Sequence, residues 1–97
     1  MTDTKYNGWS NWETWNANLW LNNEDSYWIE RAQDCLNDAE GRHKEAVSQL
    51  EDTLKEYHEE NMPELQGMYA YMLNAAMYEV DWQEIAESLL DDLEYIT

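Results

Sequence analysis

The chain has 97 residues, with 22 acidic and five basic side chains, so its formal net charge at pH 7 is −17. This length predicts one domain, residues 1–97, and the 43% hydrophobic fraction excludes a disordered acidic tail. The charge excludes direct binding to nucleic acid or to an anionic membrane and favours a basic partner.

The chain also lacks the patterns of an exported or membrane protein. No apolar run approaches the length of a membrane span, and no basic segment followed by an apolar run opens the sequence. A single cysteine, Cys35, excludes an internal disulfide. We therefore expect a cytoplasmic protein.

The first predicted helix lies in the segment NWETWNANLWLNN, residues 11–23. Ser10 and Glu13 fit a Ser-x-x-Glu capping box, which marks a helix start. The pair Asn22-Asn23 marks the end of the helix or the cap of the next one.

The tryptophans of this helix have two interpretations. Trp12, Trp15 and Leu19 recur at i, i+3 and i+7, the spacing of one helix face. An aromatic platform for stacking bases would need basic residues to hold the backbone, and residues 1–23 contain one lysine and no arginine. We therefore predict that Trp12 and Trp15 are core residues, buried against the uncharged segment 65–78.

Apolar residues at helical spacing predict two further helices. The second spans about residues 24–39, and its apolar face consists of Trp28, Ala32, Cys35, Leu36 and Ala39. Gly41 is expected to end or kink it. The third spans about residues 43–60, and its apolar face consists of Ala46, Val47, Leu50, Leu54 and Tyr57.

The last part of the chain predicts a buried helix followed by an amphipathic one. Pro63 suits the first turn of a fourth helix, which has no charged residue from Leu65 to Tyr78. A helix that is apolar almost all round is usually a central one. Asp81 and Glu84 form a second capping box, and the stripe that follows is Trp82, Ile85, Ala86, Leu89, Leu93 and Ile96. With no alternating stretch to predict a strand, we expect an all-α, compact single-domain bundle of four or five helices.

Two segments resemble a group of small, mostly uncharacterised proteins of phages and other mobile elements. YNGWSNWETWNANLWLNN, residues 6–23, is similar to their N-terminal signature, and EVDWQEIAESLLDD, residues 79–92, is similar to their C-terminal Asp-Trp-x-Glu-Ile-Ala motif. The resemblance covers about a third of the chain. It implies a phage or plasmid setting, and so a host-cell cytoplasm, but no catalytic residue, ligand or named partner.

Residues suited to catalysis or metal binding are sparse. Glu40 and His43 form one Glu-x-x-His, a spacing that di-iron bundles use twice, but His58 has Lys55 three residues before it, so no second copy exists. Cys35 lies on an apolar helix face, where cysteine is usually a small buried hydrophobe. No glycine-rich phosphate loop is present. We therefore predict no enzyme, no metal site and no cofactor.

The acids form stripes opposite the apolar helix faces. Residues 24–97 contain 20 acids and four bases, whereas residues 1–23 contain two acids and one base. Like charges at i, i+4 cost each helix a few tenths of a kcal/mol, which suggests that the charge serves a function, although high solubility alone remains an alternative. The carboxylates predicted to bind a partner are Asp52, Glu56, Glu59, Glu84, Glu87, Asp91 and Glu94.

The charge density predicts a nucleic-acid mimic. A domain of this length has a radius of gyration of ~12 Å and a diameter of roughly 32 Å. Duplex DNA carries about 19 charges over that distance, against a net 17 here. The leading hypothesis is an inhibitor that occupies the basic nucleic-acid-binding surface of a host defence nuclease, a restriction enzyme or a CRISPR effector. The alternative is an acidic adaptor or inhibitor that binds a host protein through an apolar patch. The oligomeric state stays open, and a dimer is compatible with the sequence.

Overall fold

The computed structural model describes residues 6–23 and 26–96, with side chains as far as Leu93. Its helices are α1 (Trp12–Leu21), α2 (Tyr27–Asp38), α3 (His43–Glu60), α4 (Met68–Glu79) and α5 (Trp82–Ile96). Within these ranges the chain forms no strand, and an isolated antiparallel bridge pairs Tyr6 with Trp9. The predicted all-α bundle is therefore confirmed.

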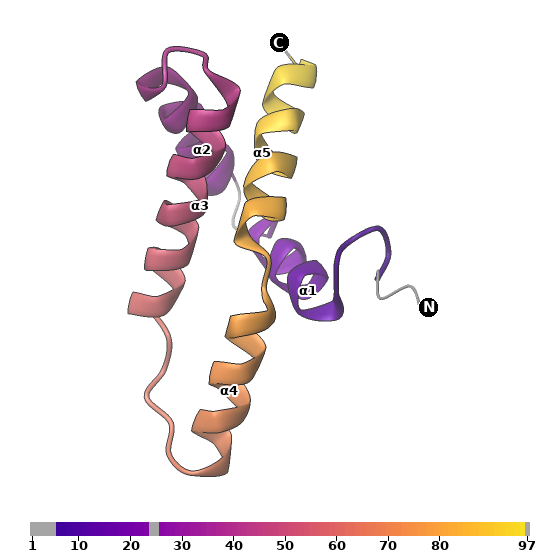
Figure 1. The fold of residues 1–97 in the computed structure, drawn as a ribbon, viewed down its shortest axis with the longest axis vertical. Helices are drawn as coiled ribbons and strands as arrows, with labels where there is room; N and C mark the ends of the chain where they lie inside the picture. Colours follow the sequence, from indigo (N-terminus) through magenta and orange to yellow (C-terminus); the bar gives the residue numbers. More distant parts are fainter. Residues whose placement is uncertain (1–5, 24–25, 97) are drawn as a thin grey trace.

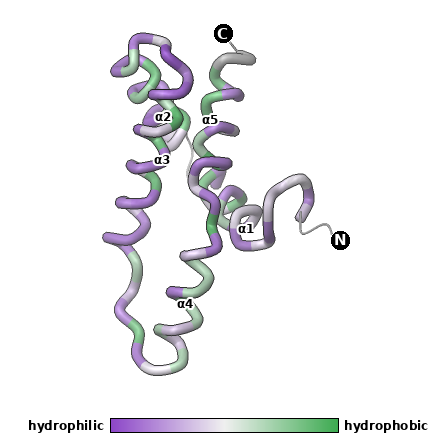
Figure 2. Tube along the Cα trace, viewed as in Figure 1, coloured by the Kyte–Doolittle hydropathy of each residue, from purple (hydrophilic) through white to green (hydrophobic). Residues whose placement is uncertain are grey.

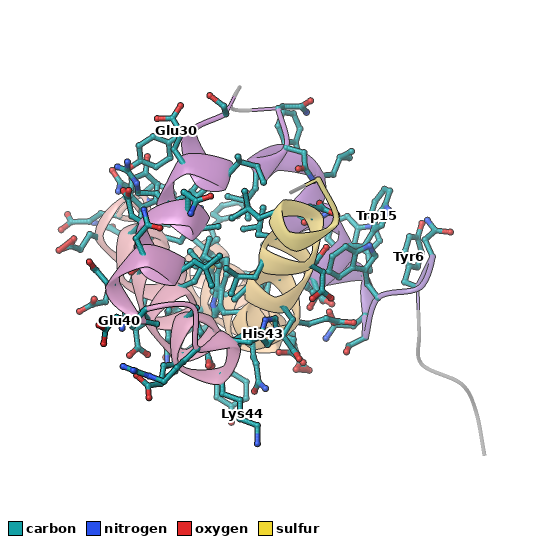
Figure 3. The ribbon with its side chains drawn as sticks, turned by 90° about the horizontal axis from the view of Figure 1, so that it is seen from above. Tyr6, Trp15, Glu30, Glu40, His43 and Lys44 are labelled. Carbon is teal, nitrogen blue, oxygen red and sulfur yellow. The ribbon has the colours of Figure 1, made fainter. Side chains whose placement is uncertain are left out.

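The core lies between α2, α3 and α5, each of which contacts the other two. Figure 3 looks along this three-helix bundle, and Figure 1 shows α1 crossing beside it. The predicted apolar faces of the second, third and last helices supply the core, except that Leu36 and Tyr57 are only half-buried. Ile96 was also predicted for this core, but its side chain lies outside the described residues. The fully buried centre includes Leu50, Leu54, Ile85 and Leu90.

A tight turn joins α2 to α3, which confirms the predicted end of the second helix at Gly41. Glu40 and Gly41 both have positive φ angles, of 55° and 81°. The amide of Gly41 donates to the Leu36 carbonyl at 3.0 Å, which satisfies an acceptor at the end of α2. Glycine adopts this backbone conformation without a steric penalty, so the chain can reverse between two antiparallel helices.

The position predicted for the fourth helix is wrong. Residues 62–66 are irregular, Gly67 has a φ of 63°, and α4 begins only at Met68, so Pro63 does not start it. No residue of α4 is buried. Figure 1 shows why: α4 runs away from the bundle, on a line that nearly continues α5, and its helix–helix packing is against α1.

The projecting α4 makes the molecule longer than its chain length suggests. The radius of gyration is 14.3 Å and the principal extents are 44 × 35 × 23 Å, whereas a typical domain of this length has a radius of gyration of about 12.5 Å. The roughly 32 Å diameter expected from length alone is therefore wrong along the longest axis. No helix in the described part of the chain is both long enough and apolar enough to span a bilayer.

Candidate functional site

Residues 6–23 and residues 79–92 are joined by hydrogen bonds in the structure. The Thr14 hydroxyl, fully buried in α1, accepts a hydrogen bond of 2.9 Å from the Asp81 amide. The Ser10 amide donates to a Glu84 carboxylate oxygen at 3.1 Å. The Asn11 side chain donates to the Glu79 carbonyl at 2.7 Å. These three bonds fasten the start of α1 to the junction between α4 and α5, so the residues of both segments have a structural role.

The caps of these helices differ in part from the predicted capping boxes. Asn11, not Ser10, caps α1, since its side-chain oxygen accepts from the Thr14 amide at 2.8 Å. Asp81 does cap α5 and accepts from the Glu84 amide at 3.1 Å. Asparagine and serine are comparable caps, so tertiary contacts decided the choice at the first helix.

The predicted burial of the N-terminal tryptophans is wrong for Trp12, whereas Trp15 is partly buried but does not belong to the core. Trp12 keeps 48% of its accessible surface, and Trp15 is half-buried, with its ring 5.0 Å from that of Tyr6 and 6.4 Å from that of Trp12 (Figure 3 shows Tyr6 and Trp15 together at one side). The face that α1 turns inward consists instead of Thr14, Ala17 and Leu21. Small side chains at two of these positions let α1 approach the bundle closely, and the large rings remain at its edge.

An apolar groove lies between α1 and α4. It has a volume of about 300 Å³. The aromatic rings along it are Trp12, Trp20 and Trp82, and α4 contributes Leu73 and Met77. Trp20 is 62% exposed at its edge. The groove is open and largely apolar, which suits an apolar side chain of a partner more than a polar substrate.

A stack of aromatic rings closes the end of the core beneath this groove. The imidazole of His58 lies between two indoles, with its centroid 5.5 Å from that of Trp28 and 4.9 Å from that of Trp82. Its Nδ1 is 2.7 Å from the Leu54 carbonyl oxygen, one turn earlier in α3. From its sequence position His58 was a candidate only for metal ligation, and nothing in the spacing of α3 indicates its place between two tryptophans.

Cys35 and Glu40, which the sequence offers as a nucleophile and a metal ligand, have structural partners. Burial raises the pKa of the Cys35 thiol above its ordinary value of 9.0, although a hydrogen bond with Thr53 acts in the opposite direction. The thiol is therefore protonated near neutral pH and weakly nucleophilic. Glu40 pairs with Arg42 at 3.3 Å. Within residues 6–23 and 26–93, no group of three or more acidic, histidine or cysteine side chains could hold a metal ion.

The predicted partner-binding carboxylates lie on the outward faces of α3 and α5. Asp52, Glu56 and Glu59 are exposed on α3, and Glu87 and Asp91 are exposed on α5. Asp92, exposed on α5 beside Asp91, was not selected from the sequence because it lies off the predicted stripe.

The other two predicted carboxylates differ from these five. Glu84 is half-buried and holds the Ser10 amide, so its carboxylate is engaged within the chain. Glu94 belongs to α5, but its side chain lies outside the described residues. The exposed part of the proposed site therefore consists of three carboxylates on α3 and two on α5.

The two acidic rows face different sides of the bundle. Each row is opposite the core face of its own helix, and the three core helices pack around one another, so the rows diverge. With helices ~8–10 Å apart and outward side chains reaching ~6 Å from each axis, the rows are roughly 20 Å apart. Within a row, the charges from Asp52 to Glu59 are spaced at one per ~5 Å of helix, against one per ~3.4 Å along one DNA strand.

The salt bridges of the protein involve acids other than those of the two rows. Arg31 pairs with Asp34 at 2.9 Å. Arg42 pairs with Glu45 at 2.8 Å, and the carboxylates of Glu45 and Glu40 raise its pKa. Among the described side chains, none of the exposed carboxylates of the two rows is in an ion pair. The salt bridges thus lie within α2 and at the α2–α3 turn, and they do not include the carboxylates of the outward rows.

These features define a small, strongly acidic helical protein with carboxylates on a three-helix bundle and apolar side chains on a projecting helix. The chain belongs to a family of unknown function, DUF7249, whose model matches residues 2–95. No curated protein and no solved structure matches the chain.

Proposed function

We propose that this protein acts by binding, not by catalysis, and that its acidic rows occupy the basic nucleic-acid-binding surface of a host defence nuclease. The exposed carboxylates of α3 and α5, none of which is in a salt bridge within the described residues, carry this proposal. The target is a restriction enzyme or a CRISPR effector, in keeping with the resemblance of residues 6–23 and 79–92 to phage and mobile-element proteins.

Because the two rows face different sides of the bundle, the shape of the target's basic surface decides whether it contacts one row or both. A flat basic surface would contact only one row, because the other row faces a different side of the bundle. A channel that surrounds nucleic acid would contact both rows, which lie roughly 20 Å apart. The proposal therefore favours a target with an enclosing basic channel, and electrostatic attraction would speed association at low salt.

The test measures DNA cleavage by a purified restriction enzyme and by an RNA-guided effector, each with increasing amounts of this protein. Inhibition should weaken as salt rises and as competing uncleavable duplex is added. One variant neutralises α3 (Asp52→Asn, Glu56→Gln, Glu59→Gln) and another neutralises α5 (Glu87→Gln, Asp91→Asn, Glu94→Gln). Each should inhibit more weakly than the native protein and with a shallower salt dependence, because fewer charges attract the target.

A matched control removes three carboxylates that are already paired with arginines: Asp34→Asn, Glu40→Gln and Glu45→Gln. This variant should inhibit nearly as well as the native protein, since it changes the net charge by the same amount but leaves both acidic rows intact. A six-fold neutralised variant that still inhibits at full strength would refute the mimic proposal.

A second candidate function is an adaptor or inhibitor that binds a host protein through an apolar patch. The groove between α1 and α4, with Trp12 and Trp20 exposed along it, favours this candidate. Such binding should survive high salt and should be lost in the variant Trp20→Ala, whereas the mimic should retain its inhibition in that variant.

A further inference from the structure

The outward face of α4 carries exposed side chains at the spacing of a coiled-coil seam. Met68, Tyr71, Ala75 and Tyr78 follow one another at i, i+3, i+7 and i+10, and Met72 lies beside them. All five are exposed, and Tyr71 and Tyr78 keep 79% and 88% of their accessible surface. These five residues are called the α4 seam below.

The opposite side of α4 already has neighbours in the chain. Leu73, Ala76 and Met77 are half-buried and line the groove toward α1. Figure 2 shows α4 largely in green and white, away from the rest of the apolar core. A helix with apolar residues on both sides is expected to be covered on both sides, and within the described residues nothing covers the α4 seam.

We propose that the α4 seam packs against the α4 seam of a second copy of this chain. At about 200 Å² for each large side chain, its two tyrosines and two methionines expose about 600 Å². Two copies would therefore bury about 1,200 Å² in total, the lower end of the range for a stable interface. Monomers rarely expose an apolar patch larger than ~600 Å².

The charge distribution favours a second copy as the occupant. Two chains of net charge −17 repel each other wherever their acidic helices meet. Between Leu65 and Tyr78 the chain carries no charge, so this is the surface on which two copies can approach without that cost. A strongly basic partner would instead be attracted to the acidic rows of α3 and α5.

The same charges make the two α4 helices antiparallel. In a parallel pair, both Glu79 carboxylates and both acidic bundles would lie side by side. In an antiparallel pair, Glu79 lies beside the N-terminal end of the partner's α4, where the helix dipole favours an anion. The two bundles then lie at opposite ends of the pair. This inference rests on α4 alone and is independent of the proposed inhibition of a nuclease.

Analytical ultracentrifugation tests the pairing. The native protein should sediment with twice the chain mass of 11.6 kDa, and added salt should tighten the dimer by screening the repulsion between its bundles. The variant Tyr71→Glu, Tyr78→Glu should be monomeric with unchanged helical circular dichroism, because both side chains are exposed. The control Gln49→Glu, Gln83→Glu adds the same charge at exposed positions of α3 and α5 and should remain dimeric.

A mixing experiment tests the antiparallel register, in which Ala75 lies opposite Tyr71 of the other copy. Tyr71→Glu and Ala75→Lys should each weaken self-association at least tenfold, and mixing the two variants should restore a dimer that contains one chain of each. A native protein that is monomeric at 100 µM (roughly a hundred thousand times a nanomolar Kd) would overturn the proposal. So would a dimer that persists in Tyr71→Glu, Tyr78→Glu.

Discussion

The buried hydroxyl of Thr14 should account for much of the attachment of α1 to the bundle. In the variant Thr14→Val the side chain keeps its shape and volume but loses the oxygen that accepts from the Asp81 amide at 2.9 Å. Asp81 is exposed, but its amide points to the fully buried Thr14 side chain, where water cannot easily replace the bond. Leaving a buried donor without a partner costs about 1–3 kcal/mol.

The expected loss is large enough to measure in a chain of this size. A destabilisation of about 2 kcal/mol corresponds to a fall in Tm of about 8–16 °C for a domain of this length. Urea unfolding followed by circular dichroism gives the free energy of unfolding, and calorimetry gives the Tm. Both should fall together, because the bond fixes α1 to the first turn of α5.

Thr53→Val is the matched control for this substitution. The Thr53 hydroxyl donates to the Gln49 carbonyl within α3 and also bonds the weakly polar Cys35 thiol, at a more exposed position than Thr14, so its loss should change the free energy of unfolding by less than about 0.5 kcal/mol. If Thr14→Val were as stable as the control, the hydrogen bonds between α1 and α5 would not be what holds the two motifs together.

Two further predictions concern the core. Trp28→Ala should cost about 3–5 kcal/mol, the usual range for a large aromatic removed from a core, because the indole is 2% exposed. Trp12→Ala should cost no more than about half as much, and equal losses in urea unfolding would contradict the observed exposure. For Cys35, burial raises the pKa of the folded thiol above 9.0, so the folded state holds its proton where the unfolded state loses it. The free energy of unfolding should therefore fall as pH rises above 9.0, and fall less steeply in Cys35→Ala; identical slopes from pH 8 to 10 would contradict this assignment.

The sequence by itself determined the three core helices and their inward faces. In α2, α3 and α5 the apolar residues recur at helical spacing and the acids occupy the other side. The apolar side must face the core and the acidic side must face water, so the orientation of each helix is fixed. The turn at Gly41 and the cap at Asp81 could also be predicted from the sequence. The turn depends on the conformational freedom of glycine, and the cap depends on a carboxylate that accepts a bond from a nearby amide. The exposure of Asp52, Glu56 and Glu59 follows from the same separation of faces.

Only the tertiary structure decided the place of α1 and α4. The spacing of Trp12 and Trp15 fits a buried face, yet Thr14 and Ala17 pack inward because small side chains allow close approach and the Thr14 hydroxyl satisfies a distant amide. A helix whose one charge is its last residue, such as α4 with Glu79, has no polar side to mark which face is outward. Its orientation depends on contacts with other elements, and these contacts cover only one side of it. Periodicity is a property of one helix, whereas burial is a property of the neighbours that the fold brings to it.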